Sequence, residues 1–183
     1  MNFAPTEDHE LLRQAVRDFA EKEAKPTVSA RDEEMQWPTE LVKKMGQLGF
    51  LGVAVNEEYG GAGLDYISYS IVVEELSRVD ASLGVIASVN NSLVCYGLER
   101  FGTEEQKREL LVPLAAGKAL GAFSLSEPGA GSDAAAQKTS AVRDGDAYVI
   151  NGVKNWVTNG DHADTIILMA MTDPSQGVRG ISA

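Results

Sequence analysis

The sequence has 183 residues, of which 44% are hydrophobic and 23% are charged, and its formal net charge is −11 at pH 7. A chain of this composition can bury a sizeable core. Its acidity argues against nucleic acid as a partner, because contacts with phosphate backbones need clustered Lys and Arg. The single cysteine, Cys95, excludes an internal disulfide and a CxxC metal or redox site.

The N-terminus carries no recognisable targeting signal. Residues 1–8 contain neither a basic segment followed by an apolar one nor the arginines of a transit peptide. No run of apolar residues approaches the length of a membrane span. We therefore expect a cytoplasmic protein with no membrane partner.

Helical signals begin at once. Thr6 is a candidate N-cap with acidic residues in the first turn behind it, and Pro26 ends the helix that Thr6 starts. A second, short helix follows Pro38 and closes at Gly49. Asp65 can cap a third helix after a glycine-rich loop.

A long, mostly apolar helix is expected from Leu83 to Phe101, and its low charge predicts burial on most sides. Thr103 to Gln106 then has the pattern of a capping box and opens another helix. These signals together predict an all-α N-terminal domain over residues 1–117.

The pattern changes to strands from residue 118 onward. An Asp-Gly turn at residues 144–146 predicts a hairpin, and no helix of any length separates the strands, which disfavours parallel crossovers. We expect residues 118–183 to be the first part of an antiparallel β-barrel or β-sandwich domain, incomplete in this sequence. The expected strands cover residues 122–125, 139–143, 147–151, 153–158 and 165–171.

The segment Gly121–Asp133 contains a strand, a proline-glycine break and the triplet Gly129-Ala-Gly131. The triplet alone does not make a dinucleotide fingerprint, because no helix follows it, and taken by itself it is better explained as an ordinary loop between strands. The glycines nevertheless allow backbone N–H groups to approach a ligand closely, and Ser126 and Ser132 add hydroxyls.

A second segment, Asn155–Gly160, contains Trp156 and Thr158. In a strand these two side chains point to the same face, where an indole beside a hydroxyl suits a planar heterocycle with a polar edge. A core tryptophan is the competing interpretation.

Other chemistries have weaker support. The sequence has no G-x-S-x-G elbow for a hydrolase. His9 is expected in an exposed first turn, and His162 lies between two aspartates that suit a solvated turn better than a metal site. Cys95 is expected to be a buried small hydrophobe, so we predict no metal.

Two motifs in this order resemble the acyl-CoA dehydrogenase family: Ser124-Leu-Ser-Glu-Pro-Gly-Ala-Gly-Ser-Asp133 and Asn151-Gly-Val-Lys-Asn-Trp-Val-Thr-Asn-Gly160. Leu48–Gly52, Glu58–Gly63 and Phe101–Lys107 also resemble the family's helical domain. The resemblance implies an α+β multidomain protein with a helical N-terminal domain, a middle β domain and a C-terminal helical bundle that this sequence lacks. It also implies a homotetramer, and the mitochondrial matrix as location in a eukaryote.

The resemblance implies FAD as cofactor and assigns roles to particular residues. The backbone and hydroxyl near Leu125 and Ser126 would bind the pyrimidine edge of the flavin. Ser132 would reach a phosphate or the acyl-CoA, and the Thr158 hydroxyl would lie near the hydride-accepting nitrogen. Phe123 and Ser126 replace the Tyr and Thr of many relatives. The implied cofactor-binding residues are Phe123, Ser124, Leu125, Ser126, Gly131, Ser132, Trp156, Val157 and Thr158.

The implied reaction is α,β-dehydrogenation of an acyl-CoA thioester, with electrons passing to an electron-transfer flavoprotein. The family's catalytic base is a glutamate of the C-terminal bundle, so we assign no catalytic residue here and expect this fragment alone to be inactive. The stretch Ser88–Leu93 resembles short-chain, butyryl-type relatives. Its Asn and Ser residues could equally satisfy neighbouring backbone groups. Short branched-chain substrates, an acyl-CoA oxidase and a non-catalytic binding or assembly module are the alternatives.

Overall fold

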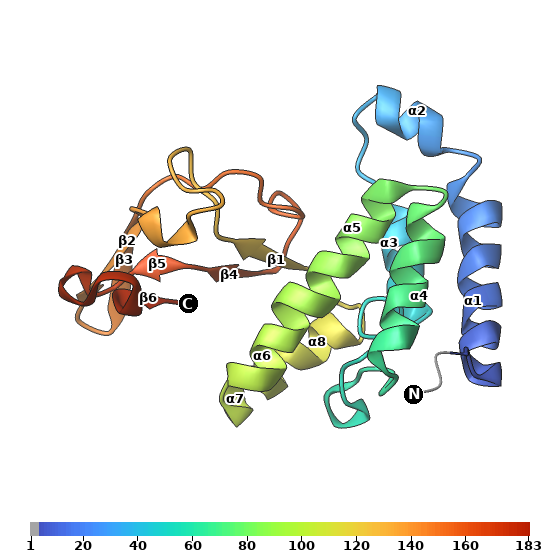
Figure 1. Ribbon diagram of the computed structural model, residues 1–183, viewed down its shortest axis with the longest axis horizontal. Coiled ribbons are helices and arrows are strands. Elements are labelled where there is room, and N and C mark those ends of the chain that lie inside the picture. The colour runs from blue at the N-terminus through green and yellow to red at the C-terminus, as the bar shows by residue number, and fades with distance from the viewer. Residues whose placement is uncertain (1–3) are drawn as a thin grey trace. The chain divides into compact units, whose positions relative to one another are not determined.

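The computed structural model describes residues 4–183 and divides into two compact units, one ending at Leu120 and the other spanning Gly121–Ala183 (Figure 1). Residues 1–3 of the N-terminal segment considered above lie outside the described residues. The division falls close to the expected domain boundary after residue 117.

The first unit is helical. Figure 1 shows α1, α4 and α5 side by side, with α1 packed on α4 and α4 on α5. The α-helices are α1 (Glu7–Phe19), α2 (Val28–Glu33), α3 (Thr39–Gln47), α4 (Tyr66–Ser77), α5 (Ala81–Ser88), α6 (Tyr96–Phe101), α7 (Glu104–Gln106) and α8 (Val112–Ala115). Three π-helical segments, Ala20–Ala24, Val89–Cys95 and Lys107–Leu111, continue α1, α5 and α7.

The expected helix starts are confirmed at Thr6, Asp65 and Thr103, whose side chains accept hydrogen bonds from the first-turn backbone of α1, α4 and α7. The expectation for His9 is wrong, since only 7% of this residue is exposed. Its Nδ1 accepts from the Thr6 backbone at 3.1 Å, which leaves Nε2 to donate to the Asp65 carboxylate at 3.2 Å. His9 therefore joins the start of α1 to the start of α4.

Helix α2 is an element that the sequence pattern did not predict. None of its residues is buried, so it lacks the apolar stripe on which periodicity depends. Arg31 instead anchors it, donating from Nη2 to Asp80 Oδ2 at 2.7 Å, while Asp80 Oδ1 caps α5 through the backbone of Ser82 at 2.9 Å.

The expected long apolar helix is confirmed as one continuous run, Ala81–Phe101. With 21 residues it is long and apolar enough to cross a membrane, so the expectation that no stretch approaches that length was wrong. Length and composition of this kind also fit a core helix, and half of its most apolar stretch is buried inside the protein. Leu83, Ile86 and Ala87 on this run belong to the hydrophobic core.

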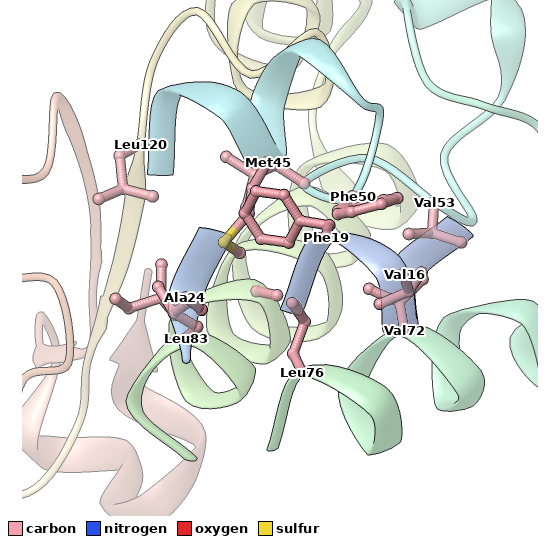
Figure 2. Close-up of a cluster of buried hydrophobic side chains, with 13 residues drawn as sticks. Val16, Phe19, Ala24, Met45, Phe50, Val53, Val72, Leu76, Leu83 and Leu120 are labelled. Carbon is pink, nitrogen blue, oxygen red and sulfur yellow. The ribbon is translucent and has the colours of Figure 1, made fainter. Parts of the chain in front are cut away.

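The core of the first unit lies between the helices and the segment after α3 (Figure 2). Phe19 packs edge-on against Phe50, with ring centroids 5.8 Å apart and an interplanar angle of 74°. Two backbones meet at Gly46 and Gly117, where a Cβ on Gly46 would lie 2.6 Å from the Gly117 carbonyl oxygen. Only glycine permits this approach.

The second unit contains two small sheets. Its strands are β1 (Gly121–Ser124), β2 (Ser140–Asp144), β3 (Ala147–Asn151), β4 (Thr165–Leu168), β5 (Ala170–Met171) and β6 (Ile181–Ser182). The predicted hairpin is confirmed as β2 and β3, with Gly145 at φ 60° in its turn. In this unit 3₁₀ turns occupy Ala134–Ala136 and, with a kink at Gly177, Pro174–Gly180; in the first unit one occupies Glu57–Tyr59.

Two expectations that concern β1, β2, β4 and β5 are wrong. β1 pairs with β4 in parallel, from Gly121 opposite Thr165 to Ser124 opposite Leu168, and β2 meets β5 in parallel (Figure 1). Because the whole hairpin lies between β1 and β4 in the chain, the crossover needs no helix. The single strand expected at residues 165–171 is broken at Met169, so that β4 and β5 enter different sheets.

Candidate cofactor site

The two motifs lie against each other within the second unit. The Asn155 backbone N–H donates to the Ser126 carbonyl oxygen at 2.7 Å, and Asn159 Nδ2 donates to the Gly121 carbonyl oxygen at 2.9 Å. The segment 155–159 therefore runs alongside β1 in the opposite direction, joined to it at both ends. The structure thus brings the two predicted halves of the site together.

Lys154 is the main link between the motifs. Its ammonium group donates to the Leu125 carbonyl oxygen at 2.8 Å, to Glu127 Oε1 at 2.9 Å and to Gln137 Oε1 at 3.0 Å. Only 8% of the Lys154 side chain and 7% of the Glu127 side chain are exposed. The result is a buried ion pair that connects three separate parts of the chain.

Glu127 forms hydrogen bonds through both carboxylate oxygens and through its backbone. Its two carboxylate oxygens accept the backbone N–H groups of Lys138 at 2.7 Å and Thr139 at 2.9 Å. Burial by itself would raise the pKa of Glu127, but hydrogen bonds from Thr139, Lys138 and Lys154 lower it to about 2. The Glu127 backbone also exchanges two hydrogen bonds with Ala130, which closes the turn through Pro128 and Gly129.

The strand expected at residues 153–158 is absent, and the same-face argument for Trp156 and Thr158 is therefore wrong. Trp156 adopts φ 58° and Asn159 φ 68°, which no strand accommodates. Asn155 and Asn159 hold this irregular backbone in place through their hydrogen bonds to the carbonyl oxygens of Ser126 and Gly121. Trp156 is 92% exposed, so it is not a core tryptophan.

The predicted site residues differ in their accessibility. Ser124 is buried on β1, whereas Gly131 and Ser132 are exposed in the loop that follows. Partly buried positions are held by Phe123, Leu125, Ser126, Val157 and Thr158.

Several groups in the loop are open to a ligand. A Cβ on Gly129 or Gly131 would meet no atom within 4 Å, so the backbone there is accessible. Within residues 4–183, the hydroxyls of Ser126, Ser132 and Thr158 form no hydrogen bond. We call these residues, Ser126, Gly129, Gly131, Ser132 and Thr158, together with Trp156, the edge. It combines free hydroxyls, accessible backbone and one exposed indole.

Four residues that organise this edge were missed as site residues: Glu127, Gln137, Lys154 and Asn159. A signal for the pair did exist, because the first motif carries two acids, Glu127 and Asp133, and the second carries a single charge, that of Lys154. The sequence alone does not indicate that Glu127 and Lys154 are buried against each other.

The remaining reactive side chains do not form a second centre. In the part of the chain that the structure describes, no three His, Cys, Asp or Glu side chains are grouped to hold a metal ion. Cys95 is fully buried, as expected, and burial raises the pKa of its thiol to about 12.

The chain is thus a two-domain protein, with an all-α unit followed by a β unit. The chain belongs to the acyl-CoA dehydrogenase family. Residues 6–118 match the model of the acyl-CoA dehydrogenase N-terminal domain, and residues 122–183 match that of the middle domain.

Curated relatives agree with this assignment. The chain is 53% identical over 183 residues to the short-chain specific acyl-CoA dehydrogenase of Clostridium acetobutylicum, covering 100% of this chain and 48% of that protein. It is 51% identical over 177 residues to the mitochondrial short-chain specific enzyme of Bos taurus, covering 97% of this chain and 43% of that one. The chain thus spans about half the length of the curated relatives it matches.

Solved structures share the fold. One, described as the electron transferring flavoprotein of Acidaminococcus fermentans, superimposes with a TM-score of 0.96 at 51% identity, covering 100% of this chain and 48% of that chain. A glutaryl-CoA dehydrogenase from Mycobacterium smegmatis in complex with FADH2 superimposes with a TM-score of 0.88 at 40% identity, covering 92% and 44%. The expected fold class, a helical domain followed by part of a β domain, is confirmed.

Proposed function

We propose that the protein to which this chain belongs is an FAD-dependent acyl-CoA dehydrogenase acting on short-chain or short branched-chain acyl-CoA thioesters. The observation that carries the proposal is the joining of the two motifs by Lys154, Asn155 and Asn159 into one edge with free hydroxyls and an exposed indole. The names of the most similar curated relatives support the short-chain substrate class.

The residues of this edge fit FAD in their chemistry. The flavin ring is planar and apolar with a polar rim, which suits the exposed Trp156 indole together with the Thr158 and Ser126 hydroxyls. The carbonyl oxygens of Leu125 and Ser126 accept from Lys154 and Asn155, and within residues 4–183 the backbone N–H groups of Leu125 and Ser126 donate to no other backbone group, so they can donate to the ring edge. Ser132 and the open backbone at Gly131 suit a phosphate.

When bound, FAD would supply the two-electron acceptor for the dehydrogenation. The chain's own residues orient the acceptor and screen it from water on one side. Leu125, Ser126 and Thr158 would hold the ring edge, Trp156 would cover its face, and Ser132 would hold a phosphate of FAD or of the acyl-CoA. Phe123, Ser124 and Val157 form the backbone that supports them.

The buried carboxylates are not suited to remove the α proton, and one of them, Asp80, is paired with Arg31 at 2.7 Å. Glu75 and Glu127 are both ion-paired, and hydrogen bonding lowers the pKa of each to about 2. A base of that strength cannot act near neutral pH on a weakly acidic carbon. We therefore place the base in a part of the longer relatives that this chain does not span.

The proposed reaction also needs an acceptor for the electrons that FAD takes up. We propose an electron-transfer flavoprotein as acceptor, in keeping with the structural similarity to the Acidaminococcus fermentans flavoprotein. The assembly that we propose is a homotetramer, located in the cytoplasm, or in the mitochondrial matrix if the source is a eukaryote.

The proposal is tested with protein expressed from the complete reading frame that contains this chain. Purified protein should be yellow, and its flavin absorbance should bleach when butyryl-CoA is added without oxygen. Colourless protein that takes up no FAD would refute the proposal. Hydrogen peroxide formed in place of reduction of an artificial acceptor would indicate an oxidase, and FAD binding without bleaching would indicate a non-catalytic module.

Replacing Trp156 with alanine should weaken FAD binding at least tenfold while changing the unfolding free energy by less than about 0.5 kcal/mol, because an indole that is 92% exposed adds little to folding. Titration of the FAD-free protein with FAD, followed by flavin fluorescence, measures the affinity. Tyr148→Ala removes another exposed aromatic from the same unit and should leave the affinity unchanged. Equal losses for both variants would remove Trp156 from the site.

A further inference from the structure

In the buried pair Lys154–Glu127, the Lys154 ammonium has no proton left for a ligand, and the Glu127 carboxylate, only 7% exposed, keeps one acceptor position on Oε2. Lys154 has three ammonium protons, and Leu125, Glu127 and Gln137 accept all three. Glu127 in turn accepts from Lys138, Thr139 and Lys154. Any contribution of Lys154 to cofactor binding must therefore pass through the segments that it holds.

Stabilisation of the fold does not by itself require such a pair. Burying two charges carries a desolvation penalty, and apolar residues of similar volume often stabilise a fold as well or better. With 8% and 7% of the side chains exposed, the penalty here applies to both partners. A charged pair, unlike an apolar one, fixes particular backbone atoms at hydrogen-bonding distance.

The atoms fixed here are those next to the candidate flavin contacts. Lys154 holds the Leu125 carbonyl oxygen, and the following residue, Asn155, holds that of Ser126. Glu127 binds the backbone N–H of Thr139, directly before β2. Its own backbone closes the turn that leads to Gly131. The pair thus sets how far the Trp156–Thr158 segment lies from the Leu125–Ser132 loop.

We propose that Lys154 and Glu127 are positioning residues for the flavin, which align the two motifs as one binding edge. This inference rests on the proposed function. It assigns the pair a role in the geometry of the bound cofactor and not only in the stability of the β unit.

Lys154→Met tests the proposal, because it removes the charge and keeps the apolar stem. Lys138→Met is the matched control: the Lys138 side chain is exposed, and the variant keeps the backbone N–H that binds Glu127. We expect FAD to bind Lys154→Met at least tenfold more weakly, and Lys138→Met with unchanged affinity. At saturating FAD, the absorption bands and fluorescence yield of the flavin should differ from the parent in Lys154→Met alone.

The flavin spectrum separates positioning from stability. A folded Lys154→Met protein with the parent's spectrum at saturating FAD would overturn the proposal, whatever its affinity. Should Lys154→Met fail to fold, hydrogen exchange of the unmodified protein decides. FAD should protect the amides of Lys138, Thr139 and Asn155 together, and protection of Asn155 without the other two would overturn the proposal. If the unmodified protein binds no FAD, the proposed function itself fails, and that result is distinct from either outcome.

Discussion

Replacing Glu75 with alanine is expected to lower the unfolding free energy of the helical unit by about 3 kcal/mol. Glu75 is 1% exposed and accepts from Arg13 at 3.1 Å, from Arg17 at 2.9 and 2.7 Å, and from Arg78 at 3.3 Å. Removing the carboxylate leaves a cavity and three like charges around it. Because these arginines reach solvent, the loss should fall at the lower end of the range for broken buried pairs. Urea denaturation followed by circular dichroism measures it.

The neighbouring residue provides the control. Glu74 also binds Arg13, at 3.0 Å, but 66% of its side chain is exposed, so Glu74→Ala should cost less than about 1 kcal/mol. Similar losses for the two variants would show that burial of Glu75 is not what matters.

The same residue gives the helical unit a dependence on pH. Hydrogen bonding from Arg17 has the largest effect on the pKa of Glu75. Together with weaker contributions from Arg13 and Arg78, it outweighs burial and lowers this pKa from 4.5 to about 2. A carboxylate with a lowered pKa stabilises the fold above its unfolded pKa, and that contribution is lost as the pH falls from about 4.5 towards 2. Glu75→Ala should therefore lose less stability than the parent over this range.

Much of the helical unit could be predicted because its signals are local. Thr6, Asp65 and Thr103 each cap a helix through a hydrogen bond to a backbone group three residues on, and the residue types alone indicate this. The hairpin of β2 and β3 is equally local, since its turn is set by Gly145. Signals of this kind require no knowledge of the rest of the fold.

The features that the sequence did not predict depend on distant partners. The parallel pairing of β1 with β4 joins residues more than forty positions apart, and His9 binds Asp65 at the distant start of α4. The candidate site shows the same division. Its two motifs were found by resemblance, but the backbone conformation of Trp156 and the burial of Lys154 follow from contacts between the motifs. Assignment of the individual cofactor contacts stays a prediction.

The polar residues Asn90 and Asn91 of the long apolar helix form hydrogen bonds with neighbouring backbone groups. Residues 88–93 suggested either a short-chain substrate pocket or side chains that satisfy neighbouring backbone. Asn91 does the latter: its Oδ1 accepts from the Val53 backbone at 2.7 Å, and its Nδ2 donates to the carbonyls of Phe50 and Ala87, each at 2.9 Å. Asn90 likewise donates to the Leu51 carbonyl at 2.7 Å.

Replacing Asn91 with leucine should therefore destabilise the helical unit by about 3 kcal/mol, because the substitution leaves the backbone groups of Phe50 and Val53 without this partner in a buried place. Thermal and urea unfolding of the variant provide the measurement. Ser92→Ala is the control: Ser92 Oγ donates only to the Ser88 carbonyl one turn back, at 2.8 Å, so its loss should cost less than about 1 kcal/mol. An Asn91→Leu protein as stable as the parent would mean that the amide serves something other than the fold. A substrate pocket in this helix would then become the better explanation for its polar residues.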